Sequence, residues 1–490
     1  MSASFLNLEY MELLKRFNNY DEYAQSLKNI STYNAVLQKQ TEEHFKPLIN
    51  WANQNKIDIT RLPRDLTLLY NIDTLDISRY DLTDIPDSFG YLVSLTKLNI
   101  SRNQLSEMPK WVKDLHNLTE LSIYKNQLTQ IPKDIATLRN LTKLDIGGNK
   151  LTEVPDTIAY IEKLTKLYMS NNRITHLPVT IKYLTNLTEL YISNNQLTTL
   201  PNQIGELKKL TKLNISSNPL IELPEFIGEL SNLTELTIDN NSLKKLPQWL
   251  GNLTNLEKLN ISYNSFTQLP DFLQNLKNLQ KLTIVGNSLT SLPTWIGKLT
   301  NLRELTIRWN KLSTLPSSIG KLTNLQKLDL GSNQLTTLPE SIGHLISLRE
   351  LYLDKNNFAE LPRSIEFLVN LNSSSVDEIK NIYKEIEKEQ TSWIKAKMLN
   401  TKSAYETHLN NFPMGANKIE AIERIDNLIQ QEKANQNDNK AWEEAKELNT
   451  LESYSTYIYN FPKGIYIDEC KERYKLKEKN SRSLFGKMFN

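Results

Sequence analysis

Asparagine recurs at intervals of 23 residues through the middle of this chain. Twelve asparagines follow this interval with no insertion between them: Asn103, Asn126, Asn149, Asn172, Asn195, Asn218, Asn241, Asn264, Asn287, Asn310, Asn333 and Asn356. Proline keeps the same interval from Pro63 to Pro362, which accounts for fourteen of the eighteen prolines. A fixed period of this length indicates stacked structural repeats, so the chain is divided by its repeat and not by the size of an ordinary domain.

Each position of the repeat, LxxLxLxxNxLxxLPxxIGxLxx, has a mechanical reason. Apolar residues two apart, such as Leu98 and Ile100, alternate with polar ones and predict a short strand with one side in the core. The asparagine turns the chain out of the strand, and its amide can satisfy buried backbone groups of adjacent units. Pro316 begins a segment with Ile319 and Leu322 three residues apart, the spacing of a short helical or 3₁₀ turn. The unit therefore predicts an α/β fold with a parallel sheet on the concave face.

This repeat resembles the 23-residue leucine-rich repeats of intracellular Ras-group-related, LAP and Roco scaffold proteins, and of many bacterial repeat proteins. The resemblance covers about residues 60–371. It implies a horseshoe-shaped solenoid that recognises proteins through its concave sheet, and it does not identify a partner. Roco proteins also carry a GTPase domain. Here Gly147-Gly148-Asn149-Lys150 lies at the repeat asparagine and lacks the GxxxxGK[ST] spacing of a phosphate-binding loop.

The regions flanking the repeats are predicted to be helical. Residues 1–58 are expected to form an N-terminal cap over the end of the core, because apolar residues stand at helical intervals, as at Leu13 and Phe17. A separate helical partner-binding module is the alternative. The solenoid is assigned to residues 59–371, with Tyr80 where its first unit lacks asparagine. A helical region follows over 372–480, and 481–490 are expected to be a flexible tail.

A second period, of 49 residues, appears after the solenoid. Residues Trp393, Ala396, Asn400, Thr401, Tyr405, Phe412, Pro413, Gly415 and Arg424 recur as Trp442, Ala445, Asn449, Thr450, Tyr454, Phe461, Pro462, Gly464 and Arg473. The pattern predicts two helical hairpins and resembles TPR-like repeats. The run Asn435-Gln436-Asn437-Asp438-Asn439 is expected to be a polar linker between them. Cys470 takes a small helix position and is expected to be buried and structural.

Composition argues against several classes of function. Lys and Arg number 58 against 56 Asp and Glu, so nucleic acid is not favoured as the main partner. The single cysteine excludes an intrachain disulfide and a Cys-based zinc site, and no histidine stands at catalytic or metal-binding spacing. We therefore expect no enzyme activity and no cofactor. Because no signal peptide and no apolar run long enough for a membrane span is present, a cytoplasmic protein is expected.

A row of charges is predicted along the concave face. The residue before the first strand leucine is charged in twelve units: Lys97, Glu120, Lys143, Lys166, Glu189, Lys212, Glu235, Lys258, Lys281, Glu304, Lys327 and Glu350. Nine of the eleven neighbouring pairs have opposite sign. With strands about 4.8 Å apart, these residues should form a ladder of ion pairs. Because the ladder neutralises itself, we interpret it as structural and not as a ligand site.

Candidate partner-binding residues are the large aromatic and arginine side chains on the polar concave face, a composition typical of interface hot spots. They are Tyr124, Tyr168, Tyr191, Tyr263, Arg303, Arg308, Trp309, Arg349 and Tyr352. Tyrosine also suits a pleated strand for structural reasons. Five aromatics on the convex side, two residues after proline, are interpreted mainly as a cover for the core, with a partner-binding stripe as the alternative. They are Trp111, Phe226, Trp249, Phe272 and Trp295.

These features together predict a non-enzymatic scaffold, with a role in signalling, that binds a protein on its concave face. One alternative is a bacterial effector or signalling regulator that uses the repeats to recognise its target. Another is a regulatory subunit of an enzyme acting in trans.

Overall fold

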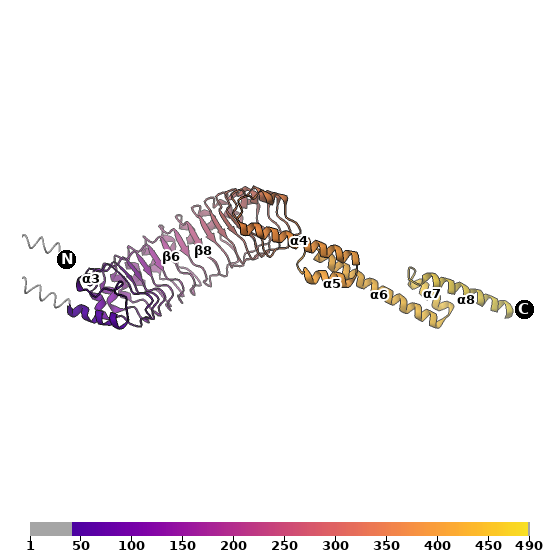
Figure 1. The fold of residues 1–490 in the computed structure, drawn as a ribbon, viewed down its shortest axis with the longest axis horizontal. Helices are drawn as coiled ribbons and strands as arrows, with labels where there is room; N and C mark the ends of the chain where they lie inside the picture. Colours follow the sequence, from indigo (N-terminus) through magenta and orange to yellow (C-terminus); the bar gives the residue numbers. More distant parts are fainter. Residues whose placement is uncertain (1–41, 489–490) are drawn as a thin grey trace, which may run out of the picture.

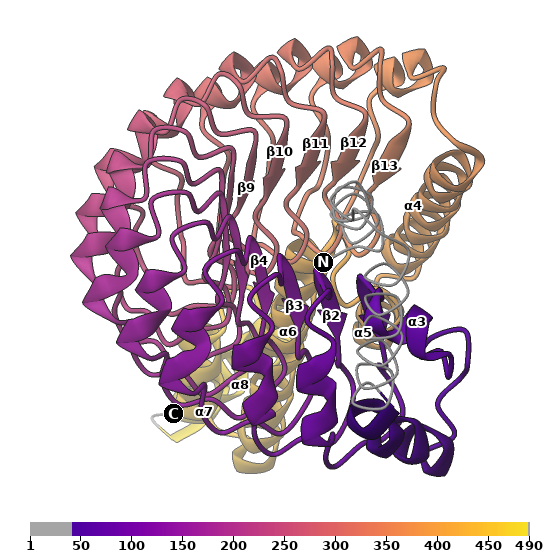
Figure 2. The ribbon, with the colours of Figure 1, turned by 90° about the vertical axis from the view of Figure 1, so that its left-hand side faces the viewer.

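The computed structural model describes residues 42–488, and these form a curved solenoid followed by an extended row of helices (Figure 1). Thirteen parallel strands make a single sheet in which each strand pairs with the next one along the chain. Seen end-on, the strands line the inside of a horseshoe and short helical turns form its outside (Figure 2). This is the predicted leucine-rich-repeat architecture, with helices at both ends.

Neighbouring strands pair in register, leucine opposite leucine, as in Leu98 opposite Leu121. The strands are β1 Thr74–Asp76, β2 Lys97–Asn99, β3 Glu120–Ser122, β4 Lys143–Asp145, β5 Lys166–Tyr168, β6 Glu189–Tyr191, β7 Lys212–Asn214, β8 Glu235–Thr237, β9 Lys258–Asn260, β10 Lys281–Thr283, β11 Glu304–Thr306, β12 Lys327–Asp329 and β13 Glu350–Tyr352. The central leucine of each strand is buried, and its two neighbours face the concave side.

The convex side consists of five-residue 3₁₀ helices, each preceded by the repeat proline in an extended conformation. They are η1 Asp87–Tyr91, η2 Lys110–Asp114, η3 Lys133–Thr137, η4 Asp156–Tyr160, η5 Val179–Tyr183, η6 Asn202–Glu206, η7 Glu225–Glu229, η8 Gln248–Asn252, η9 Asp271–Asn275, η10 Thr294–Lys298, η11 Ser317–Lys321, η12 Glu340–His344 and η13 Arg363–Phe367. The prediction of short 3₁₀ turns after proline is confirmed, since proline sets the φ angle and needs no hydrogen-bond donor there.

The repeat asparagines form a ladder of hydrogen bonds through the core. In the second unit, Asn103 accepts from the backbone nitrogens of Tyr80 and Leu82 through Oδ1, at 3.0 and 3.1 Å. Its Nδ2 donates to the carbonyls of Ile77 and Ile100 at 3.0 and 3.1 Å. Each such amide ties two coils together, as the sequence predicted, because backbone groups at the bend would otherwise be buried without partners.

The N-terminal end of the core is covered by the helix at 42–54. It places Phe45, Leu48 and Ala52 in the same core as the repeats. Tyr80, which replaces the asparagine of the first unit, accepts a hydrogen bond from the Asp58 nitrogen at 3.1 Å through its hydroxyl. The short helix α3 (Leu66–Tyr70) follows, with Asp65 as its N-cap. Residues 1–41 of the expected cap lie outside the described residues.

The helix α4 (Ser373–Leu399) closes the other end of the sheet, where a fourteenth strand would lie (Figure 2). Ser375 Oγ accepts from the Leu351 nitrogen at 2.9 Å, and Glu378 Oε1 accepts from the Leu353 nitrogen at 2.5 Å. Two side chains thus satisfy the exposed edge of β13. The repeated 23-residue period ends here because the helix has taken over the role of the next strand.

Helices α5 (Lys402–Asn411), α6 (Lys418–Leu448), α7 (Leu451–Asn460) and α8 (Ile467–Met488) continue the chain away from the solenoid (Figure 1). They enclose two small cores, one around Trp393 and Tyr405 and one around Trp442 and Tyr454. Cys470 is buried in the second core, as predicted. Helix α8 continues to Met488, beyond residue 480, where the sequence suggested the start of a tail.

The expectation of a polar linker at 435–439 is wrong. These residues lie inside α6, a continuous helix of 31 residues shared by the two small cores. Asp438 is 4% exposed, because its carboxylate accepts hydrogen bonds from the Tyr457 hydroxyl and from the Ile465 nitrogen. A run of polar residues that composition assigns to a turn is therefore a helix with one buried anchor.

Substituting Glu378 by glutamine should raise the free energy of unfolding at neutral pH. Burial, with Asp354 and Asp329 nearby, raises the pKa of Glu378 above its ordinary value. A carboxyl whose pKa is higher in the folded chain loses stability as pH rises through the interval above its unfolded pKa of about 4.3. Glutamine keeps the acceptor for Leu353 without the charge, so its advantage should vanish in acid. Urea titrations of both chains over a range of pH test this, and an advantage that persists in acid would contradict it.

Candidate functional site

Four columns of side chains run along the concave face, one member from each unit. The first and second columns are the residues that begin and end each strand. The third column stands two residues after the strand, and the fourth follows immediately, where the chain turns. Side chains in one column are about 4.8 Å from their neighbours, since they belong to adjacent strands. The candidate residues are distributed among these columns.

The first column is the predicted ladder of ion pairs. Seven of its nine opposite-sign neighbours lie within 2.6–3.7 Å of each other, nitrogen to oxygen. Glu189 is the least exposed of these acids and contacts both Lys166 and Lys212, at 3.1 and 3.4 Å. The charges are paired along the sheet, which supports their interpretation as structural.

The second column holds Tyr168 and Tyr191 in adjacent strands, with ring centroids 5.1 Å apart. The Tyr168 hydroxyl donates to Glu189 Oε2 at 2.6 Å. Burial and this hydrogen bond to a carboxylate raise the pKa of Tyr168. Burial opposes ionisation of Glu189, yet the bonds from Tyr168 and Lys166 outweigh it and lower the pKa of Glu189. Both tyrosines are half-buried and belong to the same network as the ladder.

In the third column Arg308 is bound within the sheet. Its guanidinium reaches across Gly331 of the next unit to Asp354, with nitrogen–oxygen distances of 2.7 and 2.5 Å, and lies 3.5 Å from Asp329. A Cβ at Gly331 would collide with this guanidinium. The bidentate pair fixes Arg308 across two coils. Arg308 is therefore not free to meet a partner beside Trp309, although the two are adjacent in sequence.

The fourth column has left-handed backbone in every unit from Arg79 to Lys355. Asparagine or glycine, which tolerate positive φ best, fills five of its thirteen positions, serine fills two, and arginine or lysine fills four. Tyr263 and Trp309 are the exceptions with large rings, at φ 50° and 59°. Their rings meet edge to face with centroids 6.1 Å apart, across Gly286 of the intervening unit. They are 45% and 50% exposed, so this pair presents aromatic surface to the solvent.

The remaining candidate residues stay apart from that pair. Tyr124 lies between Arg102 and Lys125, whose charged groups are 5.8 and 5.5 Å from its ring. Tyr352 lies on β13, with Lys327 5.1 Å from its ring. Arg349 is exposed at the residue before β13.

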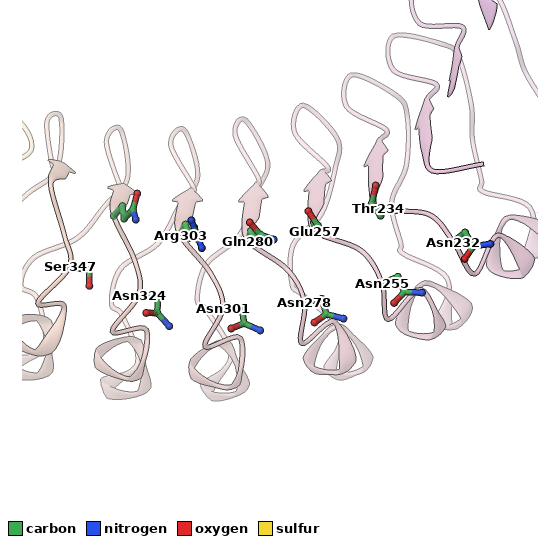
Figure 3. A pocket seen from close by; sticks show the side chains of 11 residues that line it. Asn232, Thr234, Asn255, Glu257, Asn278, Gln280, Asn301, Arg303, Asn324 and Ser347 are labelled. Carbon is green, nitrogen blue, oxygen red and sulfur yellow. The ribbon is translucent and has the colours of Figure 1, made fainter. Parts of the chain in front are cut away.

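Arg303 lines a polar groove of about 780 Å³ at the edge where the chain enters the strands (Figure 3). The groove is lined by Asn232, Thr234, Asn255, Glu257, Asn278, Gln280, Asn301, Arg303, Asn324, Gln326 and Ser347. Each of its asparagines donates through Nδ2 to a carbonyl of the preceding unit, as Asn301 does to Lys277 at 2.9 Å. Their regular row is thus a consequence of stacking the coils.

The convex aromatics cover the core. Trp111 and Trp295 are buried, and Phe226, Trp249 and Phe272 are packed against the core of the solenoid. Glycine of the preceding unit accommodates four of the five: for example, Gly228 lies against Trp249, and Gly251 against Phe272. This arrangement agrees with the structural interpretation of these residues.

Residues 42–488 contain no cluster of three or more His, Cys, Asp or Glu side chains able to hold a metal ion. Within the same residues, every helix is too short or too polar to span a lipid bilayer.

Two features of the concave face were not predicted from the sequence. The partner of Arg308 is Asp354, which stands 46 residues later and therefore in the same column two units away. The left-handed column itself was also missed. Each has a signal in the sequence: asparagine and glycine recur at the left-handed position, and Arg308 and Asp354 are opposite charges in one column with a glycine between them. Both features become visible in the sequence when equivalent positions of all repeat units are compared with one another.

Comparison with known proteins agrees with the geometry. A family model described as a leucine-rich repeat region matches residues 121–213, 190–291 and 290–468, and a second leucine-rich-repeat model matches 94–115. No curated protein matches the chain. The matched segments cover most of the chain, and the chain belongs to the leucine-rich-repeat proteins.

Solved structures share this architecture. A leucine-rich-repeat protein of Leptospira interrogans is 31% identical with a TM-score of 0.54, over 66% of this chain and 92% of that one. Internalin InlF of Listeria monocytogenes is 24% identical with a TM-score of 0.57, over 64% and 91%. The functional domain of InlJ from the same organism is 24% identical with a TM-score of 0.52, over 62% and 67%. The two Listeria proteins show a shared fold.

Proposed function

We propose that this chain is a non-enzymatic scaffold that binds a protein partner on its concave face, at a surface centred on Tyr263 and Trp309. The observation that carries the proposal is the exposure of two large aromatic rings at left-handed backbone positions. Leucine-rich-repeat folds are typically protein interaction modules, which supports the class of function. The single cysteine of this chain, Cys470, is free and buried, which is compatible with a cytoplasmic location.

The energetics of the fourth column support this location. A side chain with a Cβ costs about 1–2 kcal/mol in the left-handed region, and asparagine tolerates that region better than an aromatic residue does. Asn171, Asn194 and Asn240 occupy the same column in other units. The repeat units that carry Tyr263 and Trp309 are therefore less stable at this position than units that carry asparagine there. Strain of this kind at an exposed site points to a function, and exposed tryptophan and tyrosine are the residues that dominate binding energy in interfaces.

The double variant Tyr263→Asn/Trp309→Asn should lose the partner without losing the fold. Asparagine already occupies this column at Asn171, Asn194 and Asn240 and tolerates left-handed backbone better than an aromatic residue does, so the free energy of unfolding should stay equal or increase. A photo-crosslinking residue at position 240, which lies in the same column and is exposed, should capture a protein in cells. That capture should fall at least about tenfold in the double variant, the loss expected from two hot-spot residues.

The matched control places the same photo-crosslinking residue at position 179, which is 58% exposed at the start of η5 on the convex side. Capture from position 179 should be weak and unaffected by the double variant. Equal capture from both positions, unchanged by the double variant, would overturn the proposed location.

A further inference from the structure

The fourth column begins with three cations in consecutive units, Arg79, Arg102 and Lys125. All three are exposed, and their φ angles are 65°, 55° and 53°. Among the described residues, none of the three has a carboxylate within ion-pair distance. We call these three residues the basic row.

The basic row differs from the ladder of the first column. There, neighbouring charges alternate in sign and pair across the strands. Here, like charges stand in adjacent units about 4.8 Å apart, an arrangement that is unfavourable. The left-handed backbone adds a second cost, because asparagine or glycine fits it better than arginine or lysine does. Within residues 42–488, the Tyr124 ring lies near Arg102 and Lys125 and offsets part of these costs, but no carboxylate pairs with any of the three cations.

The surroundings of the basic row favour recognition of carboxylates. Arg102 and Lys125 flank the ring of Tyr124, which gives an apolar surface between two cations. Arginine binds carboxylates with two parallel hydrogen bonds. In an extended segment, every second side chain faces the same way at intervals of about 7 Å. Long arginine and lysine side chains can span the difference between this interval and the spacing of the units.

A continuous polyanion fits this surface less well. Asp76 and Asp145 stand in the second column of the same region, and closely spaced phosphates of a nucleic acid would approach these carboxylates. Separate carboxylates on a protein segment can meet the basic row and avoid them. The near-zero net charge of the chain, +2, also disfavours general binding of nucleic acid.

We infer that the basic row of Arg79, Arg102 and Lys125 docks an acidic segment of a protein partner. This inference rests on the proposed concave-face function and names the chemistry of one part of the partner. The aromatic pair at Tyr263 and Trp309 lies at least six units away along the sheet, so the two surfaces can be tested separately.

The test measures binding of a fluorescent peptide of alternating glutamate and serine by fluorescence anisotropy, at low and at physiological salt. Wild type should bind at low salt and lose affinity as salt increases. The triple variant Arg79→Asn/Arg102→Asn/Lys125→Asn should bind at least about tenfold more weakly, the sum expected from three exposed charge contacts. Arg102→Asn alone should give an intermediate loss.

The control is Lys355→Asn, which removes a cation from the same column at the other end of the sheet and should leave the affinity unchanged. Equal peptide binding by wild type and triple variant would overturn the inference, as would tighter binding of a single-stranded oligonucleotide than of the peptide. The Tyr263→Asn/Trp309→Asn variant should bind the peptide like wild type. If the triple variant keeps its affinity for the peptide, only the inference about the basic row is contradicted. If capture from position 240 does not depend on Tyr263 and Trp309, the proposed function is contradicted.

Discussion

Replacing Asn218 by alanine should lower the free energy of unfolding by about 3 kcal/mol, because it leaves several buried backbone groups without partners. Asn218 is 4% exposed. Its Oδ1 accepts from the Leu197 nitrogen at 3.1 Å, and its Nδ2 donates to the carbonyls of Ile192 and Ile215, both at 3.1 Å. These groups are buried between the coils, so each lost bond carries a desolvation cost.

Asn232→Ala is the matched control for this prediction. The Asn232 amide also donates to the preceding unit, to the Lys208 carbonyl at 2.8 Å, but it does so at the exposed edge. Water can replace that bond, so a loss below about 1 kcal/mol is expected. Urea unfolding of wild type and the two variants, followed by circular dichroism, measures both. Equal losses for Asn218→Ala and Asn232→Ala would show that burial of the ladder is not what stabilises the coils.

The solenoid could be predicted because its causes are local and repeated. The repeat asparagine makes the same kind of hydrogen bonds in most units, so one explanation serves for Asn218 and for its equivalents, although the Oδ1 of Asn241 has no partner. The 3₁₀ turns follow from the proline and the apolar spacing after it. The ion pairs of the first column follow from register alone, since residues 23 apart in sequence become neighbours across adjacent strands.

The candidate site was less predictable because it depends on departures from the repeat. Whether Arg308 is free or paired is decided by Asp354, two units away, and by the absence of a side chain at Gly331 between them. The contact of Tyr263 with Trp309 depends in the same way on Gly286. A pattern that describes one unit cannot contain an interaction that skips a unit.

The helical region shows a different limit. Asparagine and aspartate favour turns through short-range hydrogen bonds, which is why 435–439 resembled a linker. In the structure, the carboxylate of Asp438 instead bonds to groups 19 and 27 residues away. The 49-residue period did hold the signal, because Glu389 aligns with Asp438 and is also buried, at 9% exposure. Two acids at equivalent buried positions indicate an anchor and not a linker.

Replacing Asp438 by alanine should therefore loosen α7 and α8, with a local loss of about 2–4 kcal/mol from two unsatisfied donors. The Tyr457 hydroxyl and the Ile465 nitrogen, 2.5 Å from Oδ2, would both lose their acceptor. Exchange of the Ile465 amide with deuterium should accelerate strongly, together with exchange in α7 and α8.

Glu389→Ala is the matched variant in the first helical core. Glu389 Oε1 accepts from the Asn417 nitrogen and from Asn417 Nδ2 at longer distances, 3.3 and 3.4 Å. In addition, His408 replaces Tyr457 at the equivalent position and makes its hydrogen bond with Ser392. Because these hydrogen bonds are weaker, Glu389→Ala should lower the free energy of unfolding by only about 1 kcal/mol and should accelerate hydrogen exchange only around α5. If Asp438→Ala left exchange at Ile465 unchanged, the buried carboxylate would not be what holds the turn between α7 and α8. The second helical core would then owe its stability to the packing of Trp442, Tyr454 and their neighbours.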